Sequence, residues 1–389
     1  MGTFLINLTT QQLLSKAREL TGIADIVDSS VEMALEKWLH SPNTEAELSK
    51  QGAADMEQRL IRLLSNRLRM LRDFREHPEI HEQKIVPPLI ISGAARTGST
   101  KLHKMLAVGG DFLYLPFWQS HNPALFSGVR TEDPLQRIED AEAYVRRFDE
   151  AAPRAKFAHA YSTFEPEEEN LIHEHNICSP YPLVMAFVPS YMQWWAGQDF
   201  RQQLEFIKQA LKYIQWQFHD GDTRPWILKC PLYPGHEPLL AEVFPGAKFV
   251  ATHRHPAIVI SSAASLYLAY TQAYSDVSRK TIAGPMWCDI MASLYENYVS
   301  VRDKNPQLPM FDVSYSKNIC DGISVVENIY SHLGIPLSDK ARLAMIDWEK
   351  RNGQHKLGAH NHSLSDFSLS EEMVSQRCAD YIQRFWRHF

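Results

Sequence analysis

The chain has 389 residues, of which 44% are hydrophobic and 22% are charged. This composition is typical of a globular protein with a large core, and it excludes a disordered chain. The 46 acidic and 40 basic residues give a formal net charge of −6. Because nucleic-acid-binding proteins usually carry a basic excess, we expect no nucleic-acid partner.

The first part of the chain, residues 10–76, is expected to be helical. Its apolar residues between positions 60 and 71 recur every three or four residues, as they do on one face of a helix. We interpret the arginines between them as a solvated helix face: Arg59, Arg62, Arg67, Arg69 and Arg72. We expect residues 1–84 to form a helical region packed on a main domain that covers residues 85–389.

Three short apolar runs, each followed by a helical pattern, predict a parallel β-sheet. They cover residues 89–91, 225–230 and 248–254. Strands that alternate with helices predict an α/β fold, here a P-loop-like three-layer sandwich around a central parallel sheet. A mostly helical insertion is expected around residues 111–222. Since ligands of such folds bind at the carboxyl ends of the strands, we expect the site there.

A small-residue loop, GAARTGST, follows the first strand at residues 93–100. Small residues let backbone N–H groups approach an anion, and the start of a helix favours negative charge. Gly93 and Gly98 have the spacing of the nucleotide-triphosphatase loop, but Ser99 takes the place of its lysine. Arg96 is instead a fork-shaped donor for phosphate or sulfate oxygens. Alone, the loop is also compatible with a strand–helix turn that binds nothing.

Two residues after the third strand form a second element of the same kind. Arg254 stands at the end of this strand, and Ser262 follows eight residues later, in the next helix. A guanidinium and a hydroxyl in these positions are suited to a further phosphate group. By itself, an Arg and a Ser at this spacing is weak evidence.

Taken together, these segments resemble the bacterial-type branch of the sulfotransferases that use 3′-phosphoadenosine 5′-phosphosulfate (PAPS). The similar stretches are PLIISGAARTGST, the LKxP stretch WILKCP, LLAEVFPGAKFVATHR and THRHPAIVISS. They occur in the family's order, and the C-terminal stretches SLSDFSLSEE and ADYIQRF are similar too. The resemblance therefore extends over nearly the whole chain.

The resemblance implies a role for individual residues of this chain. The family's first loop holds the 5′-phosphosulfate, which implies this role for Arg96, Thr97, Gly98, Ser99 and Thr100. The 3′-phosphate is held by an Arg and a Ser, which match Arg254 and Ser262. The LKxP stretch places Lys229 near the transferred group. A C-terminal loop that closes on the cofactor corresponds to Arg351 and Gly353, with Lys356 close by in sequence.

The base that accepts the acceptor's proton is not identified by the motifs. Many relatives have Glu after a Trp beyond the loop and His after the LKxP proline, where this chain has Gln119 and Tyr233. We favour His236, since histidine titrates near neutrality. The alternatives are acids of the cluster at residues 167–169, above all Glu168 and Glu169, and then His121. A structural histidine and a helix-starting acidic cluster are the corresponding non-catalytic explanations.

We expect no metal. The sequence His173-Glu174-His175 is similar to a metal motif, but alternate residues of a helix do not share a face. We interpret it as a surface charge run. The cysteines are widely spaced, which argues against disulfides and a zinc site and favours a reducing compartment. With no signal peptide and no apolar run of ~20 residues, we expect a cytoplasmic protein without a transmembrane segment.

The resemblance implies an enzyme that moves a sulfuryl group from PAPS to a hydroxyl of a small or lipid-like acceptor. Its nucleotide product is adenosine 3′,5′-bisphosphate. One alternative is a P-loop small-molecule kinase, which Ser99 disfavours because kinase loops carry a lysine there. The other is a catalytically silent nucleotide-binding protein, suggested by Gln119 and Tyr233. The sequence does not indicate an oligomeric state.

Overall fold

The computed structural model describes residues 3–24, 29–353 and 362–389. Its centre is a four-stranded parallel sheet with the strand order β2-β1-β3-β4. The strands are β1 (Leu89–Gly93), β2 (Ile227–Lys229), β3 (Lys248–His253) and β4 (Met310–Ser314). The predicted α/β fold with a central parallel sheet is confirmed, whereas the sequence pattern alone does not predict β4.

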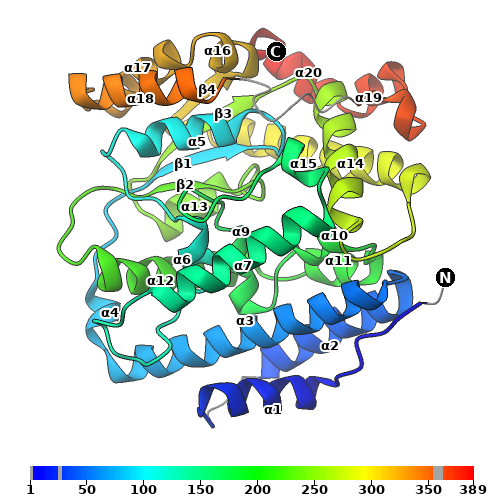
Figure 1. Cartoon of the computed structure of the whole chain (residues 1–389). Coiled ribbons are helices and arrows are strands. Elements are labelled where there is room, and N and C mark those ends of the chain that lie inside the picture. Colours follow the sequence, from blue (N-terminus) through cyan, green and yellow to red (C-terminus); the bar gives the residue numbers. More distant parts are fainter. Residues whose placement is uncertain (1–2, 25–28, 354–361) are drawn as a thin grey trace.

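Helices cover both faces of the sheet because successive strand residues point to opposite sides. On one face Leu89 and Ile91 pack with residues of α5 (Ser99–Val108), α17 (Gly322–Leu333) and α18 (Asp339–Arg351). On the other, Ile90 packs with α12 (Phe200–Phe218) and α13 (Glu237–Val243). The result is the expected three-layer arrangement (Figure 1).

The first four helices precede the sheet: α1 (Thr10–Thr21), α2 (Ser29–Glu45), α3 (Lys50–Glu76) and α4 (Glu79–Glu82). In Figure 1, α1 to α3 form a layer on the side of the molecule away from α16 to α18. They meet the insertion, since α2 contacts α11 and α3 contacts the short turn η1 (Glu174–Asn176). The division of the chain into two domains near residue 84 stays a prediction.

Between β1 and β2 the chain is mostly helical, as expected. After α5 come α6 (Phe117–His121), α7 (Leu135–Ala151), α8 (Ala155–Ala158), α9 (Asn170–His173), α10 (Pro182–Met185), α11 (Pro189–Ala196) and α12. After β3 come α14 (Pro256–Thr271), α15 (Lys280–Lys304), α16 (Tyr315–Cys320), α17 and α18, then η2 (Ser365–Phe367), α19 (Glu371–Arg377), α20 (Ala379–Phe385) and η3 (Trp386–His388).

The arginines of α3 do not form a solvated face, and that interpretation is wrong. Arg59 is buried and pairs with Glu174 through two nitrogens, at 3.1 and 2.5 Å. Arg67 is also buried and donates to Asn176 at 2.8 Å. The insertion lies on this side of α3, so the guanidinium groups find their partners inside the protein.

The segment His173-Glu174-His175 is buried, so its interpretation as a surface charge run is also wrong. Glu174 is the partner of Arg59, and burial lowers the pKa values of both histidines, to about 4 for His173 and about 3 for His175. The segment therefore joins the insertion to α3 through a buried ion pair flanked by neutral imidazoles.

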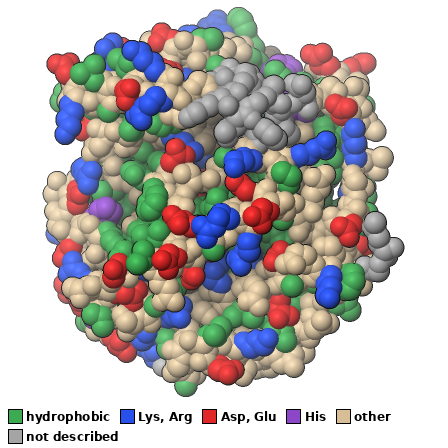
Figure 2. Space-filling view, viewed as in Figure 1, with side chains coloured by type: hydrophobic (Ala, Val, Ile, Leu, Met, Phe, Trp, Pro, Cys, Tyr) green, Lys and Arg blue, Asp and Glu red, His purple; other side chains and the backbone are tan. Residues whose placement is uncertain are grey.

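No helix within the described residues is long and apolar enough to span a membrane. On the face shown in Figure 2, acidic and basic side chains are interspersed.

Candidate active site

The loop between β1 and α5 has a conformation held by side chains. Arg96 and Gly98 have positive φ values of 71° and 85°, in the left-handed region. Thr97 Oγ1 donates to the Ala94 carbonyl at 2.6 Å and lies 2.6 Å from Thr252 Oγ1 of β3. A non-glycine residue in the left-handed region costs about 1–2 kcal/mol. The surrounding contacts therefore hold Arg96 in a backbone conformation it does not adopt freely.

Two further contacts explain why the loop begins with glycine and how it is closed from the other side. A Cβ on Gly93 would lie 2.0 Å from Thr252 Oγ1, so no larger residue fits there. Asn318 of α16 donates its Nδ2 to the Gly98 carbonyl at 3.1 Å. The loop is thus fixed between β3 and α16.

Arg96, Arg254 and Ser262 form one cluster, although they come from three segments of the chain. Arg96 Nε donates to Ser262 Oγ at 3.0 Å, and Arg254 Nη1 donates to the Arg96 carbonyl at 3.0 Å. Arg254 also lies over the Tyr315 ring, 3.9 Å from its centroid. Burial, together with the nearby Arg254 charge, lowers the pKa of Arg96. Two adjacent guanidinium groups make this cluster suited to anions.

Arg254 has a buried donor that the protein leaves unused. Its Nε is buried and has no hydrogen-bond partner among the described residues. An unsatisfied buried donor costs about 1–3 kcal/mol, which a bound acceptor group would recover.

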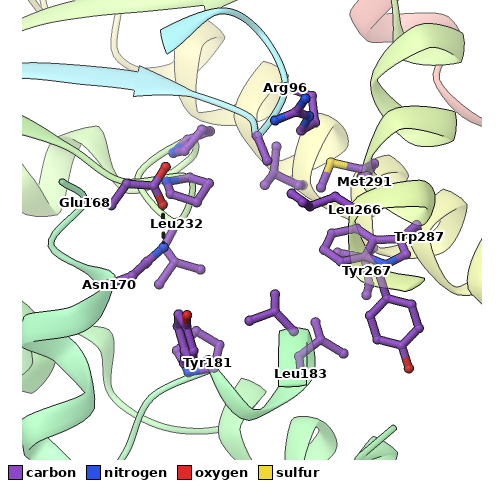
Figure 3. A pocket seen from close by; sticks show the side chains of 18 of the residues that line it. Arg96, Glu168, Asn170, Tyr181, Leu183, Leu232, Leu266, Tyr267, Trp287 and Met291 are labelled. Atoms are coloured by element: carbon purple, nitrogen blue, oxygen red, sulfur yellow. Dashed lines mark hydrogen bonds between the residues drawn. The ribbon is translucent and has the colours of Figure 1, made fainter. Parts of the chain in front are cut away.

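Lys229, at the end of β2, carries the ammonium closest to the loop helix. Its side chain is 3% exposed, and its Nζ forms an ion pair with Glu168 and lies 3.3 Å from Thr100 Oγ1 at the start of α5. Glu168 is held in turn by Asn170 Nδ2 at 2.8 Å (Figure 3). The structure therefore brings together Lys229, Thr100 and Glu168, all of which were candidates in the sequence.

Glu169 lies behind this group. Its side chain is fully buried, and its Oε2 accepts hydrogen bonds from the Lys229 backbone N–H at 2.8 Å and from the Tyr233 hydroxyl at 3.0 Å. Burial raises the pKa of Glu169 to about 8. Glu169 thus anchors the end of β2 and does not line the cavity next to it.

That cavity has a volume of about 630 Å³ and opens beside the loop. One end is polar and includes Arg96, Thr100 and Glu168. Figure 3 shows Arg96 and Glu168 at the cavity, with apolar side chains from α10, α14 and α15 across from them. Those apolar walls include Leu183, Leu266, Tyr267, Trp287 and Met291. The cavity can therefore take a mainly apolar molecule with its polar end near the loop.

Of the histidines considered as bases, one lines the cavity. His236 is a lining residue, its ring packs 4.3 Å from the Phe200 centroid, and burial lowers its pKa. His121 is buried elsewhere, stacked on Phe117 at 5.4 Å. His159 also lines the cavity. It stands alone in a segment without regular periodicity, so no pattern in the sequence singles it out.

A model of the sulfotransferase family matches residues 87–339. The chain belongs to the sulfotransferase family. The match includes all four strands of the sheet, the loop after β1, and the cluster of Arg96, Arg254 and Ser262.

Two relatives with the same name are 26% identical to this chain over 258 residues. They are the omega-hydroxy-beta-dihydromenaquinone-9 sulfotransferases Stf3 of Mycobacterium bovis and Mycobacterium tuberculosis. The match covers 64% of this chain and spans 63% of the length of these relatives.

Two solved structures are similar over almost the whole chain. Sulfotransferase STF9 from Mycobacterium avium has a TM-score of 0.84 at 22% identity, and 97% of each chain is covered. Sulfotransferase STF1 from Mycobacterium tuberculosis H37Rv has a TM-score of 0.78 at 26% identity, with 96% of this chain and 98% of that chain covered. The first of these likenesses supports the P-loop-like fold, and the second agrees with the family.

The two residues that depart from the family pattern lie outside the lining of the cavity. Gln119 is buried in α6, and its Oε1 has no hydrogen-bond partner among the described residues. Tyr233 is buried and donates to Glu169. At both positions this sulfotransferase-family chain uses the side chain within the protein core.

The C-terminal candidates are separate from the cluster around the loop. Arg351 is exposed at the end of α18 and pairs with Asp347 at 2.6 Å. Gly353 is exposed as well, and Lys356 lies outside the described residues. No contact within the described part of the chain joins Arg351 to Arg96 or Arg254. Nor does that part contain a group of three or more His, Cys, Asp or Glu residues that could hold a metal ion.

Proposed function

We propose that this member of the sulfotransferase family transfers the sulfuryl group of PAPS to a hydroxyl of an apolar, lipid-like acceptor. The observation that supports this most directly is the convergence of Lys229, Thr100 and Arg96 at the polar end of a largely apolar cavity. Cationic side chains stand where a phosphosulfate would react, and the cavity is the place for the acceptor.

The residues of the loop and the cluster fit a donor with two phosphate sites. The loop at residues 96–100 opens α5 and would hold the 5′-phosphosulfate. Arg254 and Ser262 would hold the 3′-phosphate, and the unused buried Nε of Arg254 is the donor such a group requires. Arg351 and Gly353 would contribute only if the following segment closes over the nucleotide. The bound donor supplies the sulfuryl group and a phosphate as leaving group.

The protein's own contribution to the reaction is positioning and charge. The sulfuryl group passes roughly in line between two oxygens, so preorganised charge is the main catalytic device. Lys229 and Arg96 would neutralise the charge that develops on the leaving phosphate. Because Glu168 is the counter-ion of Lys229, the ammonium is held in place before the donor arrives. Of the proposed bases, His236 and Glu168 line the cavity and Glu169 does not.

The proposed acceptor class rests on the cavity and on the relatives. The Stf3 relatives are named for an omega-hydroxy menaquinone derivative, which is a hydroxyl on an apolar molecule. The walls formed by Leu183, Leu266 and Trp287 suit the apolar body of such a molecule. Nucleic acid and metal have no role in this scheme.

A transfer assay tests the proposal. The protein is incubated with PAPS and a panel of hydroxylated quinones, phenols and long-chain alcohols, and mass spectrometry detects the sulfated product. We expect product with wild type and a loss of turnover in Lys229→Met, with Arg201→Ala, an exposed arginine paired with Glu242, as the matched control. Binding of adenosine 3′,5′-bisphosphate without turnover would favour a silent nucleotide-binding protein. Consumption of ATP that depends on Mg²⁺ would favour a kinase.

A further inference from the structure

A histidine and a glutamate outside the motifs meet at the cavity. His159 Nε2 lies 3.3 Å from both carboxylate oxygens of Glu167. Both residues line the cavity, and their side chains are 14% and 8% exposed. We propose that His159, oriented by Glu167, is the base that accepts the hydroxyl proton of the acceptor. This inference rests on the proposed sulfuryl transfer.

Glu167 determines which nitrogen of His159 carries the proton. Burial raises the pKa of Glu167, but the charge and hydrogen bond of His159 and the charge of Lys229 outweigh it and lower the pKa to about 2. An ionised carboxylate only accepts hydrogen bonds, so Nε2 of His159 is the donor. The lone pair is then on Nδ1, which has no hydrogen-bond partner within the described residues.

Glu167 is itself held firmly. Its Oε1 accepts the backbone N–H of Glu168 at 2.9 Å, and its own N–H donates to the Leu115 carbonyl at 2.8 Å. A carboxylate fixed in this way orients the imidazole and stabilises the imidazolium that forms when a proton arrives, as in other histidine–carboxylate pairs.

The position of the pair suits a base in this reaction. Glu167 holds His159, and the next residue, Glu168, holds Lys229. Two consecutive glutamates thus place an imidazole and an ammonium at the polar end of the cavity. The ammonium is suited to the leaving phosphate, and the imidazole is suited to the incoming hydroxyl.

The other groups at the cavity are less suited to this role. Both oxygens of Glu168 are engaged, one by Lys229 and one by Asn170, so taking up a proton would break the ion pair. His236 has no carboxylate partner, and burial against Phe200 lowers its pKa and makes it a weaker base. Of the three, His159 alone combines a free lone pair with a carboxylate that stabilises its charged form.

The step balances without a further reactant. The acceptor's O–H bond breaks, and its proton goes to Nδ1 of His159. The oxygen lone pair forms the new O–S bond, while the bond from sulfur to the 5′-phosphate oxygen breaks and its electron pair leaves on that phosphate.

Variants and acceptors of different acidity test the role of His159. Turnover by wild type, His159→Asn, His236→Asn and the matched control His332→Asn is measured with two acceptors, an aliphatic alcohol and a nitrophenol that ionises near neutral pH. We expect His159→Asn to lose about 10²–10⁴ in rate with the alcohol, because a general base contributes this much. With the nitrophenol the loss should be far smaller, and added imidazole should restore part of the alcohol rate.

The dependence on acceptor acidity separates a base from a merely structural residue. Equal losses with both acceptors, or an unchanged alcohol rate in His159→Asn, would overturn the assignment. A loss confined to His236→Asn would transfer the role to His236. The wild-type rates test the proposed function and the variant ratios test His159, so the two can fail separately; a wild type that transfers no sulfuryl group overturns both.

Discussion

Replacing Arg254 with alanine should abolish most of the preference for adenosine 3′,5′-bisphosphate over adenosine 5′-monophosphate. Its guanidinium is fixed by the Arg96 carbonyl at 3.0 Å and by the Tyr315 ring at 3.9 Å, and its buried Nε has no partner among the described residues. A charge-assisted hydrogen bond contributes about 1.5–3 kcal/mol, so the ratio of the two dissociation constants should fall by roughly 10- to 150-fold.

Isothermal titration calorimetry with the two nucleotides measures this ratio directly. Affinity for the monophosphate should change little, because it lacks the group that Arg254 would hold. Arg254→Lys should keep part of the preference, since an ammonium retains the charge but not the planar fork. Arg201→Ala is the control, because that arginine is exposed and pairs with Glu242. An unchanged ratio in Arg254→Ala would mean that the 3′-phosphate is bound elsewhere.

Three further outcomes follow from the structure. Glu174→Gln leaves Arg59 without its buried counter-ion and should lower the free energy of unfolding by about 3–5 kcal/mol in urea denaturation. Glu169 has a folded-state pKa of about 8 against an ordinary 4.5, so its stabilising contribution is full below pH 4.5 and is lost as pH rises through 8; Glu169→Gln should remove this dependence from unfolding curves. Leu266→Glu puts a charge into the apolar wall and should raise KM for an apolar acceptor while calorimetry shows unchanged nucleotide binding.

The elements that the sequence by itself determined are those with local patterns. The strands β1, β2 and β3 are short apolar runs bounded by proline, glycine or polar residues, and each is buried. The order of the LKxP and THR stretches led to the family, which the comparisons confirm. The edge strand β4 was beyond such patterns, because its first three residues are only half-buried and its central Asp312 pairs with Arg302.

What only the tertiary structure decided is which charged groups are buried and which side chains meet. Arg59 and Glu174 are 115 residues apart in the sequence, and each reads as a surface residue until α3 and the insertion pack together. His159 carries no local signal, because its importance depends on Glu167 and on a cavity assembled from distant helices. Periodicity encodes which face of an element is apolar, whereas the partner of a charged side chain depends on the packing of the whole chain.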